Sequence, residues 1–240
     1  MIGRIVWWAL IATVALGTAA LQLDRRSFES PALATAIPSP LRSIALQVGA
    51  REALRAGDAD LALERSRNLV RQRPLPAEHL RLLAQAQFAS GDLVGGSQTI
   101  QAAAQRGWRD RASQEAMLRL AIAGGADEEA VRRYTALLLL SPESSDMLRA
   151  LGPTLFDNDA QLARATMIDL LRASPRWHAP FLQRGVQLLP PQTFVDIITG
   201  ALADAAPMPC DIIERAARAT AARNEAAGER LTLFAAERCG

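Results

Sequence analysis

The chain contains no lysine, so all 27 of its basic side chains are arginines. They are balanced by 25 acidic side chains, which leaves a formal net charge of +2. This balance lacks the clustered basic footprint of nucleic-acid-binding proteins, so we expect no nucleic-acid partner. Guanidinium groups can recognise phosphates or carboxylates, but coding bias in a GC-rich genome also removes lysine and adds alanine. We favour the coding bias as the explanation for the absence of lysine.

Histidine and cysteine are also scarce, with two of each in 240 residues. His79 and His178 lie far apart and outside any metal-binding spacing, so both are expected on solvent-exposed helix surfaces. The chain has no Cys-x-x-Cys motif, phosphate loop, dinucleotide fingerprint or Gly-x-Ser-x-Gly motif. The run at 157–159, Asp-Asn-Asp, is explained better by turn chemistry than by calcium binding. We therefore expect a protein without catalytic residues, metal or cofactor, which is not an enzyme.

Aromatic residues make up only 5% of the chain, and no segment alternates apolar and polar residues as a half-buried strand does. From Leu41 onward, apolar residues instead recur at helical spacing, as in DEEAVRRYTALLLL at 127–140. Hydrophobic residues form 50% of the chain, which is enough for a sizeable core. The sequence therefore predicts an all-α fold.

Charged residues are absent between Ile5 and Leu23. As a helix this stretch is about 28 Å long, close to the ~30 Å hydrocarbon thickness of a bilayer. Trp7 and Trp8 lie near its start, where aromatic rings favour the membrane interface. The flanking basic groups are nearly balanced and do not fix the orientation.

The position of this apolar stretch indicates an export signal or signal anchor, with the bulk of the chain outside the cytoplasm. Small residues at 17–20 leave signal cleavage open, but the lack of a clear cleavage site favours retention. Residues 1–23 are therefore predicted to be a single transmembrane anchor in a bacterial inner membrane, with a periplasmic C-terminal domain. Residues 24–40 contain three prolines, and we expect an extended linker there.

Turn-forming residues recur at a constant interval. Gly57, Gly91 and Gly125 are spaced by 34 residues, and Asn158 follows after 33. A small residue stands five positions after each of them: Ala62, Gly96, Ala130 and Ala163. Seventeen positions after each stand Pro74, Trp108, Pro142 and Pro175. The turn residue would end one helix, the small residue would let two helices pack closely, and proline would stop the second helix.

This pattern resembles the tetratricopeptide repeat, a helix–turn–helix unit of about 34 residues. Leu80, Leu83 and Ala84 fit the first-helix pattern, and Tyr134 stands where the family favours an aromatic residue. The family's tryptophan position is occupied by Leu46, Gln114 and Met147. The resemblance implies an α-solenoid of antiparallel helix pairs, with four repeats over residues 41–175.

The register weakens after Pro175, where residues 176–207 are expected to form a degenerate fifth helix pair and 208–240 a capping helical hairpin. Cys210 and Cys239 lie almost equally far from the hairpin turn near Asn224. In an exported chain this symmetry favours a disulfide, worth about 3–4 kcal/mol, over two unpaired thiols.

Stacked repeats of this family line a concave groove with their first helices. Arg51, Gln85 and Arg119 occupy equivalent positions, each 34 residues apart. The same stripe includes Glu78, Arg81, Phe88 and Glu115. Guanidinium groups at intervals beside an apolar patch suit an extended or helical peptide with acidic residues. The alternative is a solvated face whose arginines pair with nearby glutamates.

We therefore expect a membrane-anchored periplasmic scaffold that recruits a protein or peptide partner to membrane-bound machinery. Bacterial cell-envelope or exopolysaccharide assembly is one setting for such a scaffold. The alternative is an accessory subunit of a thiol- or cofactor-handling complex, such as one for cytochrome maturation. That alternative requires an accessible, reducible pair at Cys210 and Cys239.

Overall fold

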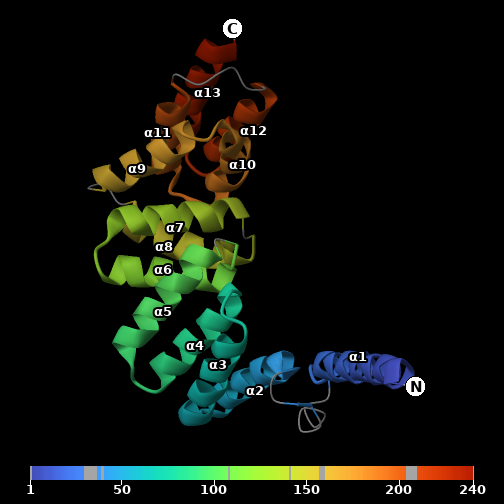
Figure 1. Ribbon diagram of the computed structural model, residues 1–240. Coiled ribbons are helices and arrows are strands. Elements are labelled where there is room, and N and C mark those ends of the chain that lie inside the picture. Colours follow the sequence, from blue (N-terminus) through green and yellow to red (C-terminus); the bar gives the residue numbers. More distant parts are fainter. Residues whose placement is uncertain are drawn as a thin grey trace. The chain divides into compact units, whose positions relative to one another are not determined.

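The structure is a computed structural model that describes residues 2–29, 37–38, 41–107, 109–140, 142–156, 160–203 and 210–239 (Figure 1). These residues form helices, turns and short connections, and no strand occurs among them. The predicted all-α fold is confirmed. The chain divides into two compact units, Met1–Ser113 and Gln114–Gly240.

After the N-terminal helix α1, the helices of each unit pack neighbour to neighbour in pairs, as in an α-solenoid. The α-helices are α1 (Ile2–Arg26), α2 (Ser43–Ala56), α3 (Ala59–Gln72), α4 (Ala77–Ala89), α5 (Leu93–Arg106), α6 (Arg111–Ala123), α7 (Asp127–Leu140), α8 (Ser145–Leu155), α9 (Gln161–Arg172), α10 (His178–Leu188), α11 (Pro191–Leu202), α12 (Cys210–Ala221) and α13 (Glu225–Cys239). Two short 3₁₀ helices, η3 (Pro142–Ser144) and η4 (Pro175–Trp177), precede α8 and α10. The pairs begin at residues 43, 77, 111, 145, 178 and 210, so their spacing is 34 residues at first and then 33 and 32.

The predicted turn glycines end the first helices of their pairs. Gly57 has a φ of 78°; its N–H donates to the Leu54 carbonyl at 3.2 Å, and the next N–H, of Asp58, donates to Ala53 at 2.9 Å. These two bonds define a Schellman motif, which requires a left-handed residue and so favours glycine. Gly91 and Gly125 repeat the motif with φ values of 85° and 66°. The fourth predicted turn residue, Asn158, lies outside the described residues.

The aspartate that follows the first two of these glycines starts the second helix. Asp58 Oδ1 accepts the Leu61 N–H at 3.0 Å, and Asp92 Oδ1 accepts the Gly95 N–H at 2.8 Å. A carboxylate at this N-cap position satisfies an unpaired amide and favours the positive end of the helix dipole. The Gly-Asp pair therefore ends one helix and begins the next.

The small residues predicted at the contacts within each pair are buried. Ala62 and Ala130 are fully buried, and Ala163 is 1% exposed. Gly96 lies under the Phe88 ring, because a Cβ at Gly96 would stand only 2.7 Å from that ring. Small side chains thus allow the close approach of paired helices.

Among the described residues, the fully buried aromatic rings belong to the second unit. The first unit has an alanine cluster at Ala53, Ala62 and Ala86, and it also buries the aliphatic side chains of Leu69, Leu82 and Ile100. The second has a continuous core of Leu, Ile, Val and aromatic side chains that runs from Leu118 to Ala235. Its ring pairs are Tyr134 with Phe156 at 5.3 Å between centroids and Phe181 with Phe194 at 5.7 Å.

The expectation that both histidines are solvent-exposed is wrong. His79 is 3% exposed and its Nδ1 lies 3.0 Å from the Arg73 carbonyl oxygen. His178 is 4% exposed and its Nε2 lies 2.9 Å from the Leu171 carbonyl oxygen. Since a carbonyl only accepts, each ring nitrogen donates and satisfies a carbonyl at the end of the preceding helix pair. Each histidine therefore joins consecutive pairs.

Candidate interaction surfaces

Arg81, a predicted binding residue on α4, is held by a contact between helix pairs. Its Nε lies 3.1 Å from Asp110 Oδ2, and the two side chains are 17% and 20% exposed. Asp110 precedes α6 and also accepts the Ser113 N–H at 3.2 Å, as an N-cap residue does. Arg81 therefore positions the start of the next pair.

The other predicted residues of the first unit lie at or near the surface. Arg51 is half-buried, while Glu78 and Gln85 are exposed, and the structure shows no side-chain hydrogen bond or ion pair for these three among its described residues. Phe88 is half-buried over Gly96, so its ring packs within its own pair. Arg51 on α2 and Gln85 on α4 thus remain available at equivalent positions.

The remaining predicted residues belong to the second unit. Glu115 on α6 accepts a hydrogen bond from the Ser144 hydroxyl at 2.8 Å, which ties α6 to η3. Arg119 is exposed on the same helix. The expected alignment of Arg119 with Arg51 and Gln85 stays a prediction.

A groove of about 220 Å³ lies between the first helices α10 and α12 of the last two pairs. Its apolar lining is Leu182, Val186, Ile212, Ala216 and Ala219, and its polar lining is Gln183, Gln187 and Arg215. Leu182 and Val186 are almost fully buried and form the floor. Arg215 Nη1 lies 2.5 Å from Asp211 in an exposed pair at the rim. We did not predict this groove, although the i, i+4 spacing of its apolar residues was visible in the sequence.

The C-terminal hairpin contains both cysteines. Cys210, the first residue of α12, is disulfide-bonded. Cys239, the only other cysteine, ends α13, but its side chain lies outside the described part of the chain. The pairing of the two therefore stays a prediction. Asn224 Oδ1 accepts the Ala227 N–H at 2.9 Å and caps α13 after the predicted turn.

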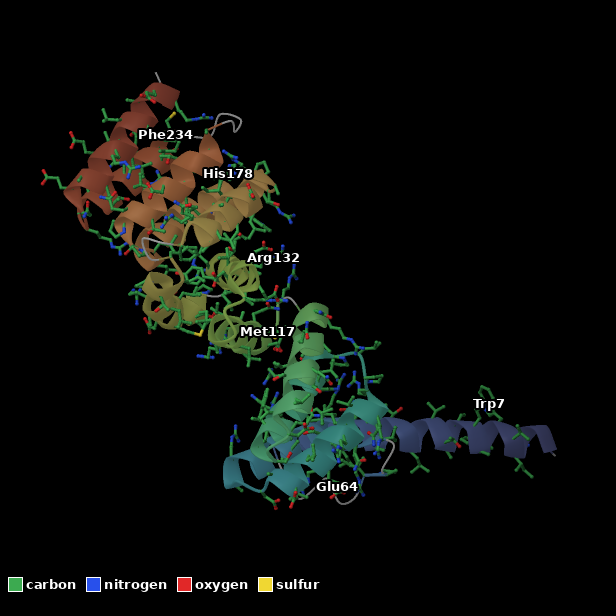
Figure 2. The ribbon with its side chains drawn as sticks, turned by 90° about the vertical axis from the view of Figure 1, so that its left-hand side faces the viewer. Trp7, Glu64, Met117, Arg132, His178 and Phe234 are labelled. Carbon is green, nitrogen blue, oxygen red and sulfur yellow. The ribbon has the colours of Figure 1, made fainter. Side chains whose placement is uncertain are left out.

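Helix α1 is long and apolar enough to cross a membrane over Gly3–Arg26. Most of its apolar side chains are exposed, and Figure 2 shows Trp7 projecting away from the helix. The helix ends at Arg26, three residues beyond the predicted anchor 1–23, so the first residues of the predicted linker 24–40 are helical. Most of the rest of that linker lies outside the described residues.

Asp24, in the last turn of α1, caps the N-terminus of α2. It is 2% exposed, and its carboxylate accepts the Ile44 N–H and the Ala45 N–H, each at 3.0 Å, and the Ser43 hydroxyl at 3.2 Å. These amides have no partner within α2, and a carboxylate there also favours the helix dipole. We call this contact the Asp24 joint. It was not predicted, because Asp24 lies 19 to 21 residues from its partners.

Among the described residues, no three His, Cys, Asp or Glu side chains gather in a way that could hold a metal ion. No protein-family model and no curated protein matches the chain.

Proposed function

We propose that the protein is a membrane-anchored scaffold that presents a tetratricopeptide-like helical array to a protein or peptide partner. The observation that carries the proposal is the Asp24 joint. It connects a helix fit to cross a membrane directly to the first helix of the array through a buried carboxylate. Such a connection holds a binding surface at a fixed orientation to the membrane, as recruitment to membrane-bound machinery requires.

Two surfaces support partner binding. Arg51 and Gln85 present polar groups at equivalent positions of adjacent first helices, which suits a peptide with acidic residues. The groove between α10 and α12 has an apolar floor and a polar rim, which suits the apolar side of a helical segment. By analogy with the use of such repeats, bacterial cell-envelope or exopolysaccharide assembly is the setting we favour.

We further propose a single-pass protein of a bacterial inner membrane with its C-terminal domain in the periplasm. The disulfide at Cys210 supports this compartment, because disulfides persist in oxidising compartments and are rare in the cytosol. A reporter fused after Gly240 tests the orientation. If a reporter that works only in the cytoplasm is active at this position, the proposed orientation and the disulfide are both contradicted.

Site-specific photo-crosslinking in native membranes tests the scaffold function. A photoreactive residue at Gln85, or at Gln183 on the groove rim, should give a discrete crosslinked product with a second protein. The matched control is Glu229, which is also exposed but lies on α13 outside the groove. If neither Gln85 nor Gln183 gives a product that Glu229 lacks, the scaffold function is wrong.

The alternative, an accessory subunit of a thiol-handling complex, rests on the same disulfide at Cys210. Replacing both cysteines by serine separates the two functions. A scaffold loses stability but still binds its partner at permissive temperature, whereas a thiol-handling subunit loses function while its unfolding temperature changes little.

A further inference from the structure

The Asp24 joint determines which edge of the first unit lies next to α1. The C-terminal end of α1 meets the N-terminal end of α2, so α2 runs away from the joint (Figure 1). Helix α3 is antiparallel to α2 and returns toward it. Arg73, which follows α3, has Nη1 3.5 Å from the Ser43 hydroxyl, the same hydroxyl that contacts Asp24. The C-terminal end of α3 is therefore at the joint.

The next helix pair has the same orientation. Arg106, in the last turn of α5, has Nη1 2.7 Å from the carbonyl oxygen of Pro74, the residue after Arg73. One edge of the first unit thus contains the ends of α1, α3 and α5 and the connection from α3 to α4. We call it the joint edge.

The joint edge is basic. Five exposed arginines lie on it: Arg25, Arg26, Arg71, Arg73 and Arg106. The exposed carboxylates near it are Glu29 and Glu78. Asp24 is buried in the joint, and Asp110 is paired with Arg81. The opposite edge, at the Gly-Asp turns, instead carries Asp58, Asp60 and Asp92 beside Arg55.

Large apolar side chains are exposed on both edges, but those of the joint edge stand among arginines, whereas Leu93 and Val94 of the opposite edge follow Asp92. Phe28 follows α1 and is 66% exposed, and Leu75 lies between α3 and α4 and is 80% exposed. Arginine near a helix C-terminus also stabilises the helix dipole, which accounts for part of the charge. The dipole does not account for Phe28 and Leu75. Basic groups interspersed with exposed apolar side chains are typical of surfaces that lie in a membrane interface.

We propose that the joint edge docks on the anionic phospholipid headgroups of the bilayer that α1 crosses. The guanidinium groups bind lipid phosphates, and Phe28 and Leu75 insert among the headgroups. Docking fixes the tilt of the first unit on the membrane, in addition to the Asp24 joint. This inference rests on the proposed membrane anchoring.

A fluorescent probe in the full-length protein tests the docking. The probe is attached at Leu75→Cys, or at Val94→Cys as the matched control, which is 71% exposed near the Gly-Asp turn of the opposite edge. Each protein is reconstituted with lipids that carry a quencher near the headgroups. Vesicles of phosphatidylcholine alone are compared with vesicles that contain about one third phosphatidylglycerol.

Docking predicts that quenching at Leu75 rises at least twofold in the anionic vesicles and falls again at high salt, while quenching at Val94 stays low. Replacing Arg71, Arg73 and Arg106 by glutamine should lower the Leu75 signal to the Val94 level. The double variant Arg25→Gln, Arg26→Gln should lower the quenching at Leu75 in part. Because both substitutions are on α1, they leave the α3–α4 connection that carries the probe unchanged. Equal quenching at both positions, or no effect of lipid charge in the wild type, overturns the inference.

Flotation of the same samples separates this inference from the proposed anchoring. A protein that floats with both kinds of vesicle but shows no quenching at Leu75 is anchored without docking, which overturns the inference alone. A protein that floats with neither kind of vesicle is not anchored, which overturns both.

Discussion

The two units build helix pairs on the same plan but stabilise them differently. The first unit packs alanines such as Ala53 and Ala62 beside the buried aliphatic side chains of Leu69 and Ile100, and it joins its pairs through polar contacts such as Arg81 with Asp110. The second unit also buries aromatic rings, those of Tyr134, Phe156, Phe181 and Phe194. Burial of apolar groups stabilises a fold in proportion to the area removed from water. Polar contacts contribute little net free energy, but they fix how the helices are oriented. Aromatic rings bury the most area per side chain, so the largest contributions from single residues are expected in the second unit.

The largest expected effect is in the second unit. Phe181 is fully buried, and Phe181→Ala should lower the free energy of unfolding by about 3–5 kcal/mol, because it leaves a cavity. Denaturant unfolding of the full chain in detergent measures it. The control Leu162→Ala, at a side chain that is 54% exposed, should cost below about 0.5 kcal/mol. A small effect at Phe181 would remove the contrast between the units.

The turn glycines should behave alike in both units. Gly57→Ala and Gly125→Ala should each cost about 1–2 kcal/mol, because both residues are left-handed and an added Cβ meets no atom within 4 Å. Unfolding curves of the two variants measure this cost. Gly124→Ala is the control, since Gly124 has no positive φ. Unequal costs at Gly57 and Gly125 would show that the surrounding core, and not the turn, sets the effect.

The polar contact at Arg81 should have a smaller effect. Arg81→Met should cost about 1 kcal/mol, because Asp110 keeps its bond to the Ser113 N–H. The neighbouring exposed residue Gln85 provides the control, with Gln85→Met below about 0.5 kcal/mol. If Arg81→Met instead leaves stability unchanged and abolishes partner crosslinking, Arg81 is a binding residue.

Alkaline pH should destabilise the second unit selectively and modestly. Burial raises the pKa of the Tyr134 phenol, whose hydroxyl donates to the Leu148 carbonyl at 3.1 Å. Because the pKa is raised in the folded state, the neutral phenol's contribution to the free energy of unfolding is complete below the unfolded-state pKa of 10.0. This contribution is lost as the pH rises above that pKa. Tyr134→Phe should abolish this component of the pH dependence in unfolding curves. Because Tyr134 is the only tyrosine, persistence of that component in the variant would assign it to another group.

Features set by nearby residues could be predicted from the sequence. The helix pairs, the turns at Gly57 and Gly91 and the buried Ala62 follow from a repeated local pattern. The Asp24 joint and the buried His79 could not be predicted in this way. Their partners belong to another helix or to a preceding pair, and a single sequence does not show such contacts.

The candidate binding residues divide in a similar way. The period grouped Arg51 and Gln85 as equivalent positions, which stays a prediction as a binding surface, and it could not show that Arg81 pairs with Asp110 or that Phe88 covers Gly96. A side chain of a first helix can point to solvent or to the next pair. Periodicity alone does not separate these two outcomes.

Amide hydrogen exchange at Ile44 and Ala45 tests the central claim most directly, because the proposed scaffold depends on a fixed joint between α1 and α2. The full chain in nanodiscs is compared with Asp24→Asn, and Asp58→Asn is the matched control at another helix cap. We predict slow exchange of both amides in the wild type and in Asp58→Asn, and exchange at least tenfold faster in Asp24→Asn. Fast exchange in the wild type, or equal exchange rates in all three proteins, would contradict the Asp24 joint and the scaffold function proposed from it.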